Sequence, residues 1–293
     1  MISASLIKEL REKTNAGMMD CKKALEATNG DLSQAADWLR EKGISKAQKK
    51  ADRIAAEGLA AIKIDGNIAA IVEVNSETDF VAKNNEFISL VDTILDCILS
   101  NEVETVEDVL ALSTGDGTVN DLIINKTATI GEKLSLRRFA RIVKSDEEVF
   151  GDYTHMNGRI AVLTVINGSN EEVAKDVSMH AAAMRPMYVK SSDVPTETLE
   201  KEMKIIKEQL LNEGKPENII EERIMPGKVD AYYSEVCLEN QAFVKAENGE
   251  TVAEFVKNNG GEIVTMVRYE VGEGIEKKEE NFAEEVAKQI QGA

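Results

Sequence analysis

Apolar residues recur at helical spacing three times near the start of the chain. The groups that share this spacing are Leu6 with Leu10, Cys21 with Leu25, and Leu32 with Ala35 and Leu39. The pattern therefore predicts three short helices. A unit of about forty residues is at the lower limit for independent folding, so we expect it to pack against a partner or against a following helix that extends to about Glu57.

Helix stop and start signals lie between the second and third of these helices. Gly30 can adopt the left-handed conformation that ends a helix, and Asp31 can cap the next one, with Gln34 answering three residues later. Gly43 is expected to end the three-helix bundle.

An internal repeat follows, at an offset of 92 residues. GNIAAIVEVN (66–75) aligns with GRIAVLTVIN (158–167), and each is a β-branched run of strand length after a turn glycine. Further matches join 81–83 to 173–175, the short amphipathic stretches headed by Thr105 and Thr251, and the strand-like segments 134–143 and 262–271. The chain therefore predicts two related modules of strand, helix, short helix and strand, which places it in the α+β class.

The second module contains an insertion from Val194 to about Tyr233. Its first apolar stripe consists of Leu199, Met203, Ile206 and Leu210, and its second begins with Ile219, Ile220 and Ile224, on either side of a break at 214–216. A projecting helical hairpin exposes such stripes unless they are covered, so it is a candidate for self-association or partner contact. Packing of the two helices on each other alone is the alternative.

Phe80 lies in a polar turn, EVNSETDFVAKNNEF (73–87), between a predicted strand and a helix. Thr78 or Asp79 could cap the helix while Phe80 packs on its first turn. However, the repeat aligns Asp79 and Phe80 with two glutamates, Glu171 and Glu172, which would be unfavourable to bury. The module therefore does not require an apolar group here, and we favour an exposed aromatic anchor for a partner protein.

The charge distribution argues against nucleic acid as a direct partner. The net charge is -18, yet residues 1–57 contain eleven Lys or Arg against nine Asp or Glu, so the acidic excess lies in the remainder and would repel phosphate backbones. The basic group Lys46, Lys49, Lys50 and Arg53 is expected to be a solvated helix face, with a binding patch as the alternative. The three cysteines are widely spaced and odd in number, which favours reduced, buried thiols. No apolar run reaches membrane-spanning length and no signal peptide is recognisable, so we expect a cytoplasmic location without membrane contact.

Enzymatic chemistry has little support in this sequence. No phosphate-binding loop ending in Gly-Lys-Ser/Thr is present, and the Gly115 to Gly117 and Gly272 to Gly274 pairs lack both the lysine and a following helix. Two histidines without a nucleophile nearby suggest no other catalytic arrangement. We therefore expect no catalytic residues, metal or cofactor, and a noncatalytic helical adaptor or scaffold is the alternative function.

Four segments in order resemble bacterial elongation factor Ts: AGMMDCKKAL (16–25), GDLSQAADWLR (30–40), TDFVAKNNEF (78–87) and RYEVGEGIEK (268–277). The resemblance covers essentially the whole chain. It implies a guanine nucleotide exchange factor that binds elongation factor Tu in its GDP-bound and nucleotide-free forms. It also implies an N-terminal domain similar to ubiquitin-associated domains and a hairpin that can form a homodimer. Met225-Pro226-Gly227 is expected to interrupt the second helix of the hairpin, because proline lacks an amide donor and clashes with the preceding turn. In the family the hairpin usually continues at this point.

Carried over by position, the resemblance makes Asp79 and Phe80, with the flanking Thr78 and Val81, the contacts with the GTPase. In the family the aromatic ring enters between helices of the GTPase domain and disturbs the magnesium and phosphate end of its nucleotide site. The remaining implied contacts are Arg11, Met18, Met19, Lys22, Ile130, Gly131 and His180.

Several of these residues have structural alternatives. The methionines could seal the bundle, Lys22 could be a solvated lysine, Gly131 could serve only a turn, and His180, which aligns with Ile88, could be a hydrogen-bonded core residue. The predicted domains are 1–55 (three helices and a basic linker helix), 56–145 (first core subdomain), 146–190 with 237–275 (second core subdomain), 191–236 (hairpin) and 276–293 (C-terminal helix).

Overall fold

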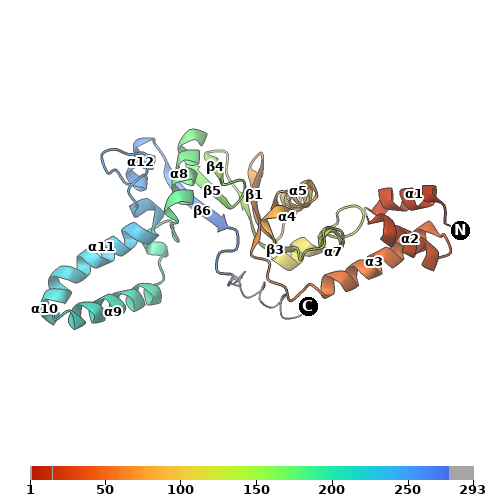
Figure 1. Cartoon of the computed structure of the whole chain (residues 1–293). Coiled ribbons are helices and arrows are strands. Elements are labelled where there is room, and N and C mark those ends of the chain that lie inside the picture. Colours follow the sequence, from red (N-terminus) through yellow and green to blue (C-terminus); the bar gives the residue numbers. More distant parts are fainter. Residues whose placement is uncertain (1, 15, 277–293) are drawn as a thin grey trace. The chain divides into compact units, whose positions relative to one another are not determined.

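The computed structural model describes residues 2–14 and 16–276 (Figure 1). The C-terminal helix predicted within 276–293, from Phe282 to Ile290, lies outside the described residues. The chain divides into two compact units, one of Met1–Leu59, Val72–Phe139 and Val271–Ala293 and the other of Ala60–Ile71 and Ala140–Glu270. The structure is mixed helix and sheet, as the predicted α+β class requires.

The first unit begins with three helices, α1 (Ala4–Thr14), α2 (Met18–Ala27) and α3 (Leu32–Gln48). Their small core consists of Leu10, Cys21, Ala24, Leu25 and Ala35. Gly30 is left-handed at φ +87°, and the Asp31 carboxylate accepts a hydrogen bond from the Gln34 amide at 2.9 Å. The predicted stop and cap are therefore confirmed.

Gly43 does not end the bundle, contrary to the prediction. It is buried inside α3, and a Cβ atom at this position would lie 3.6 Å from the Ala128 side chain of α7 (Val119–Ile130). The glycine lies in the contact between the two helices, and this packing outweighs its weak helix propensity. The helix also ends earlier than expected, at Gln48 rather than near Glu57.

The first sheet has the strand order β1-β2-β3, with β1 at Glu57–Asp65, β2 at Ile68–Ser76 and β3 at Ser135–Val143. Between β2 and β3 come α4 (Asp79–Ala82), α5 (Asn85–Ser100), α6 (Val106–Ala111) and α7. Helix α5 has the largest buried face, which includes Phe87, Leu90, Ile94 and Ile98. The division between the two units passes through β1 and β2.

The second sheet is antiparallel, in the order β4-β5-β6, with β4 at Glu148–His155, β5 at Ile160–Asn167 and β6 at Glu262–Glu270. Helix α8 (Glu171–Met184) packs on β4 and β5, and α12 (Val252–Asn258) precedes β6 (Figure 1). The short helices of the two repeated modules, α6 and α12, each begin with a capping box, at Thr105 and Thr251 respectively. The four strands predicted from the repeat are confirmed, whereas β1 and β4 were not predicted.

The insertion forms a hairpin. After the short turn η1 (Ser191–Asp193), α9 (Thr196–Asn212) runs antiparallel to a second arm made of α10 (Glu217–Ile219), η2 (Ile220–Ile224) and α11 (Met225–Val236), and η3 (Leu238–Asn240) follows (Figure 1). Leu210 and Ile220 are buried, so the two arms pack on each other.

Pro226 does not break the second arm, which corrects the predicted interruption. The proline lies in the first turn of α11, and the five residues Ile220–Ile224, which precede α11, form a π-helical turn. A wider turn accommodates a residue that lacks an amide donor and would clash with the carbonyl four positions earlier. The helical path is therefore continuous through Met225-Pro226-Gly227.

Candidate partner-binding site

Phe80 lies on α4, a helix of only four residues, and its side chain is 79% exposed. The next residue, Val81, is buried and fixes the inner side of this turn. Asp79 is exposed and pairs with Lys83 at 2.7 Å. The prediction that the aromatic ring is exposed rather than packed into the core is confirmed.

A break after α4 separates Phe80 from the helix that follows. Asn84 caps α5 by accepting a hydrogen bond from the Glu86 amide at 2.8 Å. In the second module the equivalent helix α8 starts at Glu171 and continues unbroken to Met184. The first module therefore presents Phe80 on a separate turn, which the second module lacks.

Two loops of the first unit are joined beside this turn. The Glu132 Oε2 atom accepts hydrogen bonds from the amides of Glu77 (3.1 Å) and Thr78 (2.9 Å), and its Oε1 atom accepts one from the Thr78 hydroxyl (2.7 Å). In return, the Glu77 carboxylate accepts from the Lys133 amide at 2.6 Å and pairs with Arg53 at 3.2 Å. We call these five residues, Arg53, Glu77, Thr78, Glu132 and Lys133, the interlock.

Ile130 and Gly131 lie at the end of α7, directly before Glu132. Gly131 is the left-handed C-cap at φ +91° and is exposed, and its carbonyl accepts a hydrogen bond from Lys50 Nζ at 2.5 Å. The turn function considered for Gly131 is therefore present. Because the interlock joins this loop to the Phe80 turn, the two implied contact regions are neighbours.

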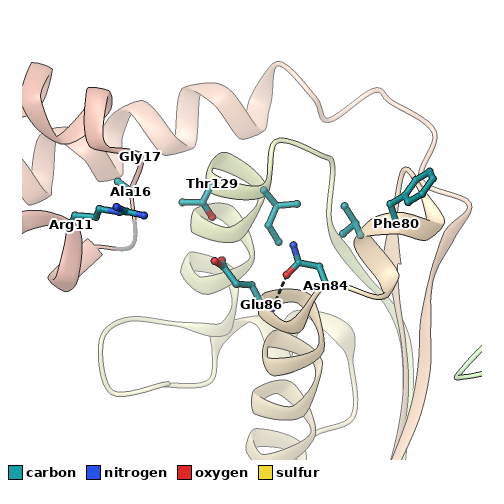
Figure 2. A pocket seen from close by; sticks show the side chains of 9 residues that line it. Arg11, Ala16, Gly17, Phe80, Asn84, Glu86 and Thr129 are labelled. Carbon is teal, nitrogen blue, oxygen red and sulfur yellow. Dashed lines mark hydrogen bonds between the residues drawn. The ribbon is translucent and has the colours of Figure 1, made fainter. Parts of the chain in front are cut away.

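A cavity of about 400 Å³ connects the Phe80 turn with the N-terminal helices (Figure 2). Its lining comes from four elements and their loops: Arg11, Ala16, Gly17, Phe80, Val81, Asn84, Glu86, Thr129 and Ile130. Figure 2 shows Arg11 at one end and the Phe80 ring at the other, pointing away from Asn84 and Glu86. The structure thus brings four of the implied contacts to one concave surface: Arg11, Phe80, Val81 and Ile130.

Met18 and Met19 begin α2 and are 60% and 64% exposed. They do not seal the small core, which excludes the structural alternative considered for them. Lys22, one turn later, is exposed, and its Nζ atom lies 3.8 Å from Glu26 Oε1. An ion pair of this kind on a helix surface contributes little stability, so Lys22 remains available to a partner.

His180 is fully buried in the second unit, so the core alternative applies and its side chain has no surface to offer a partner. Its Nδ1 atom accepts from the Val244 amide at 3.2 Å, and its Nε2–H therefore donates to the Gln241 side chain at 3.0 Å. Gln241 in turn donates to the carbonyls of Met184 and Glu235. Burial lowers the pKa of His180 below its ordinary value of 6.5, and the hydrogen bond to Gln241 opposes this effect.

This environment predicts a pH dependence of stability. The unfolded chain takes up a proton below about pH 6.5 that the folded protein excludes, so the free energy of unfolding falls as the pH decreases below that value. We expect His180→Gln to reduce the difference in unfolding free energy between pH 7.5 and pH 5.5, by no more than the limit of about 1.4 kcal/mol that one proton sets. Urea unfolding at both pH values measures this difference.

The control is His155→Gln, which removes the other histidine at an exposed position of β4. It should leave the difference between the two pH values unchanged. A His180→Gln variant with the pH dependence of the parent would contradict the neutral, buried histidine.

Glu73 is a buried carboxylate that the sequence interpretation did not single out. Its oxygens accept from Arg137 Nη1 (2.9 Å), Arg138 Nε (2.6 Å), Asn75 Nδ2 (3.1 Å) and the Gly272 amide (2.9 Å). Burial raises the pKa of Glu73, but the Gly272 amide, Arg137, Arg138 and Asn75 together outweigh it and hold the pKa below its ordinary value of 4.5. The cluster attaches the segment after β6 to the first sheet.

Within 2–14 and 16–276, no group of three or more His, Cys, Asp or Glu side chains is arranged to hold a metal ion. Over the same ranges, no helix combines the length and the apolar character needed to cross a membrane. Cys21 and Cys237 are buried and Cys97 is half-buried, all three as free thiols.

The sequence did not point to the interlock residues Glu77, Glu132 and Lys133, and it gave Arg53 only as a member of the basic group. They lie in three segments separated by more than twenty residues, and charged residues are common throughout this chain. The only available signal was the position of Glu77 and Glu132 next to implied contact residues.

The sequence profile of the family described as elongation factor TS matches residues 77–273, about two thirds of the chain. The matched range includes Phe80, most of the interlock, the second repeated module and the part of the first module that follows β2. This chain belongs to the elongation factor Ts family.

Proposed function

We propose that this protein promotes the release of GDP from elongation factor Tu by inserting Phe80 beside the magnesium and phosphate end of the nucleotide site. The observation that supports this proposal is the 79% exposure of Phe80, an aromatic residue on a short turn whose ring is not packed into its own fold. Aromatic side chains of this kind dominate the binding energy of protein interfaces. The site of action is the cytoplasm, where the protein meets GDP-bound and nucleotide-free elongation factor Tu.

Thermodynamic linkage sets the energy that such a mechanism requires. If the factor weakens nucleotide binding, the nucleotide weakens binding of the factor by the same free energy. A ten-thousand-fold acceleration corresponds to about 5.5 kcal/mol, whereas burial of one phenylalanine contributes about 2–3 kcal/mol. Phe80 therefore acts together with further contacts.

The N-terminal helices supply the best candidates for those contacts. Arg11 lies at the other end of the cavity that Phe80 borders, and Met18 and Met19 are exposed on the neighbouring helix α2. Two methionines presented side by side offer adaptable apolar surface to a partner. We assign this bundle, which resembles ubiquitin-associated domains, the role of a second docking element.

The direct test is the release of a fluorescent GDP analogue from elongation factor Tu in a stopped-flow experiment. The release rate should rise with the concentration of this protein and saturate. The protein alone should not retain the analogue, since it has no nucleotide site of its own in this proposal. An unchanged release rate at micromolar concentrations of the protein would refute the proposed function.

A double variant tests the second docking element. Met18→Ala with Met19→Ala removes two exposed side chains, so the melting temperature should stay within about 1 °C of the parent. We expect kcat/KM for GDP release to fall about tenfold, which corresponds to about 1.4 kcal/mol of lost contact energy.

The matched control for this variant is Met156→Ala, which truncates a methionine that is 65% exposed in the turn after β4. The control should exchange at the parental rate. If the double variant also did so, the N-terminal helices would not be the second contact.

Self-association through the hairpin remains a prediction. The buried Leu210 and Ile220 show that part of both stripes is covered within one chain. Ile205, Leu211 and Ile219 stay exposed along the arms. Sedimentation equilibrium over a range of concentrations measures whether a homodimer forms.

A further inference from the structure

The turn that carries Phe80 is held in place by neighbouring segments rather than by its own helix. A single helical turn is not stable by itself, because nucleation fixes several residues for one hydrogen bond. Thr78 is the N-cap residue of α4, but its side chain forms no cap. Its hydroxyl donates instead to Glu132, 54 residues away in the sequence.

The contacts at Glu132 favour a carboxylate. One oxygen receives two backbone amides and the other receives the Thr78 hydroxyl, so all three partners are donors. Hydrogen bonds to a charged acceptor are roughly twice as strong as neutral ones. A glutamine at this position lacks the charge, and it could serve all three partners only with its oxygen toward the two amides and with the Thr78 hydroxyl turned to accept from its NH₂ group.

Glu77 completes the connection in the opposite direction. Its carboxylate accepts from the Lys133 amide and pairs with Arg53, while Lys133 Nζ donates to the Arg53 carbonyl at 2.9 Å. The Glu77 side chain is 20% exposed, so these charges are partly shielded from water. Three chain segments are therefore cross-linked next to Phe80.

The second module provides an internal comparison. The repeat offset aligns Glu77 and Thr78 with Ser169 and Asn170. Asn170 caps α8 in the ordinary way by accepting from the Val173 amide at 3.0 Å. Ser169 reaches the loop before β6 through one neutral hydrogen bond to the Asn259 carbonyl, at 3.1 Å. The corresponding turn of the second module is thus held by neutral hydrogen bonds of Ser169 and Asn170. The interlock occurs in the copy that carries the exposed aromatic ring.

We infer that Glu132 and Glu77 are positioning residues that hold the Phe80 turn in its insertion-ready conformation before the GTPase arrives. This inference rests on the proposed function. A probe that is already ordered does not lose conformational freedom when it binds. If the turn were ordered only part of the time, its apparent affinity would fall by that fraction.

The test is a cycle of four proteins: the parent, Glu132→Gln, Phe80→Ala and the double variant. GDP release from elongation factor Tu is measured for each over a range of factor concentrations. We expect Glu132→Gln to reduce kcat/KM about tenfold in the parent and less than twofold in the Phe80→Ala background. Glu107→Gln, which makes the same substitution at an exposed position in the first turn of α6, is the matched control and should retain the parental rate.

A spectroscopic measurement separates positioning from general destabilisation. With 4-fluorophenylalanine at position 80, the parent should give one ¹⁹F resonance, and Glu132→Gln should shift, broaden or split it while the melting temperature changes little. In the unaltered protein, the amides of Glu77 and Thr78 should exchange hydrogen much more slowly than an unstructured peptide, because their acceptor is Glu132.

Each outcome decides one question. Three results would overturn the positioning role and leave the proposed function intact. Glu132→Gln could lose equal activity in both backgrounds, it could lose none in the parent, or the Glu77 and Thr78 amides could exchange at unstructured rates. A Phe80→Ala variant that exchanges at the parental rate would instead remove the proposed lever, and the positioning role with it.

Discussion

Replacing Phe80 with alanine is expected to slow GDP release from elongation factor Tu by roughly 30- to 150-fold at limiting concentrations of the factor. The side chain is exposed in the free protein, so its full apolar surface is available for burial on the partner. Burial of a phenylalanine contributes about 2–3 kcal/mol, and each 1.4 kcal/mol corresponds to about a factor of ten. Stopped-flow release of a fluorescent GDP analogue measures kcat/KM for both proteins.

The variant should keep the stability of the parent, because Phe80 makes little contact with its own fold. Its melting temperature therefore serves as an internal check. Val143→Ala, which truncates another exposed apolar side chain, at the end of β3, is the activity control and should leave release unchanged. Some binding should survive in Phe80→Ala, because the N-terminal helices remain. A Phe80→Ala protein with full activity would be incompatible with an aromatic lever.

Replacing Glu73 with alanine is expected to lower the free energy of unfolding by about 3 kcal/mol, since it leaves two guanidinium groups beside an empty position. This value is at the lower end for a broken buried ion pair because Arg137 and Arg138 are 28% and 30% exposed and keep part of their hydration. The Gly272 amide and the Asn75 side chain also lose an acceptor. Urea unfolding at pH 7 provides the measurement.

The pH dependence gives this prediction a second test. The folded pKa of Glu73 lies below 4.5, so its stabilising contribution is complete above the unfolded pKa and is lost as the pH falls through the folded value. The difference in stability between parent and variant should therefore shrink below about pH 4.5. Glu247→Ala, at an exposed carboxylate in the second unit, is the control. Equal urea midpoints for parent and Glu73→Ala at pH 7 would contradict the assignment of Glu73 as a buried charge that holds the segment after β6.

Much of the fold could be predicted because its strongest elements have a period and a duplicate. Strands β2 and β5 are buried along nearly their whole length, and the same offset predicts both. Strands β1 and β4 were missed for a physical reason. Strand β1 is mostly half-buried, so its apolar alternation is weak. Strand β4 contains Gly151, and a glycine weakens the sequence pattern of a strand. The glycine is there because a Cβ atom would lie 2.2 Å from the backbone of Ala174 in α8.

The predictions were wrong or undecided at residues whose role depends on tertiary packing rather than on the neighbouring sequence. Glycine is the usual residue at a helix end, yet Gly43 is buried inside α3, where the helix packs against α7. His180 looked like either a contact or a core residue, and only the positions of Val244 and Gln241 decide between the two.

The exposure of Phe80 was predictable, because the duplicated module carries glutamate at the same position. Its support by Glu132 was not predictable. The two loops are more than fifty residues apart in the sequence, and no local periodicity connects them. Such long-range polar contacts become visible only when the three-dimensional structure brings the loops together.

The π-helical turn before Pro226 also determines how the two arms of the hairpin align. Apolar stripes alone would allow one arm to slide along the other by a full heptad and still bury leucine and isoleucine. A proline can occupy only a place where no amide donor is needed, so the wide turn cannot migrate along its helix. This one residue therefore marks a fixed point on the arm, and Ile220, in the wide turn itself, is kept facing inward by it.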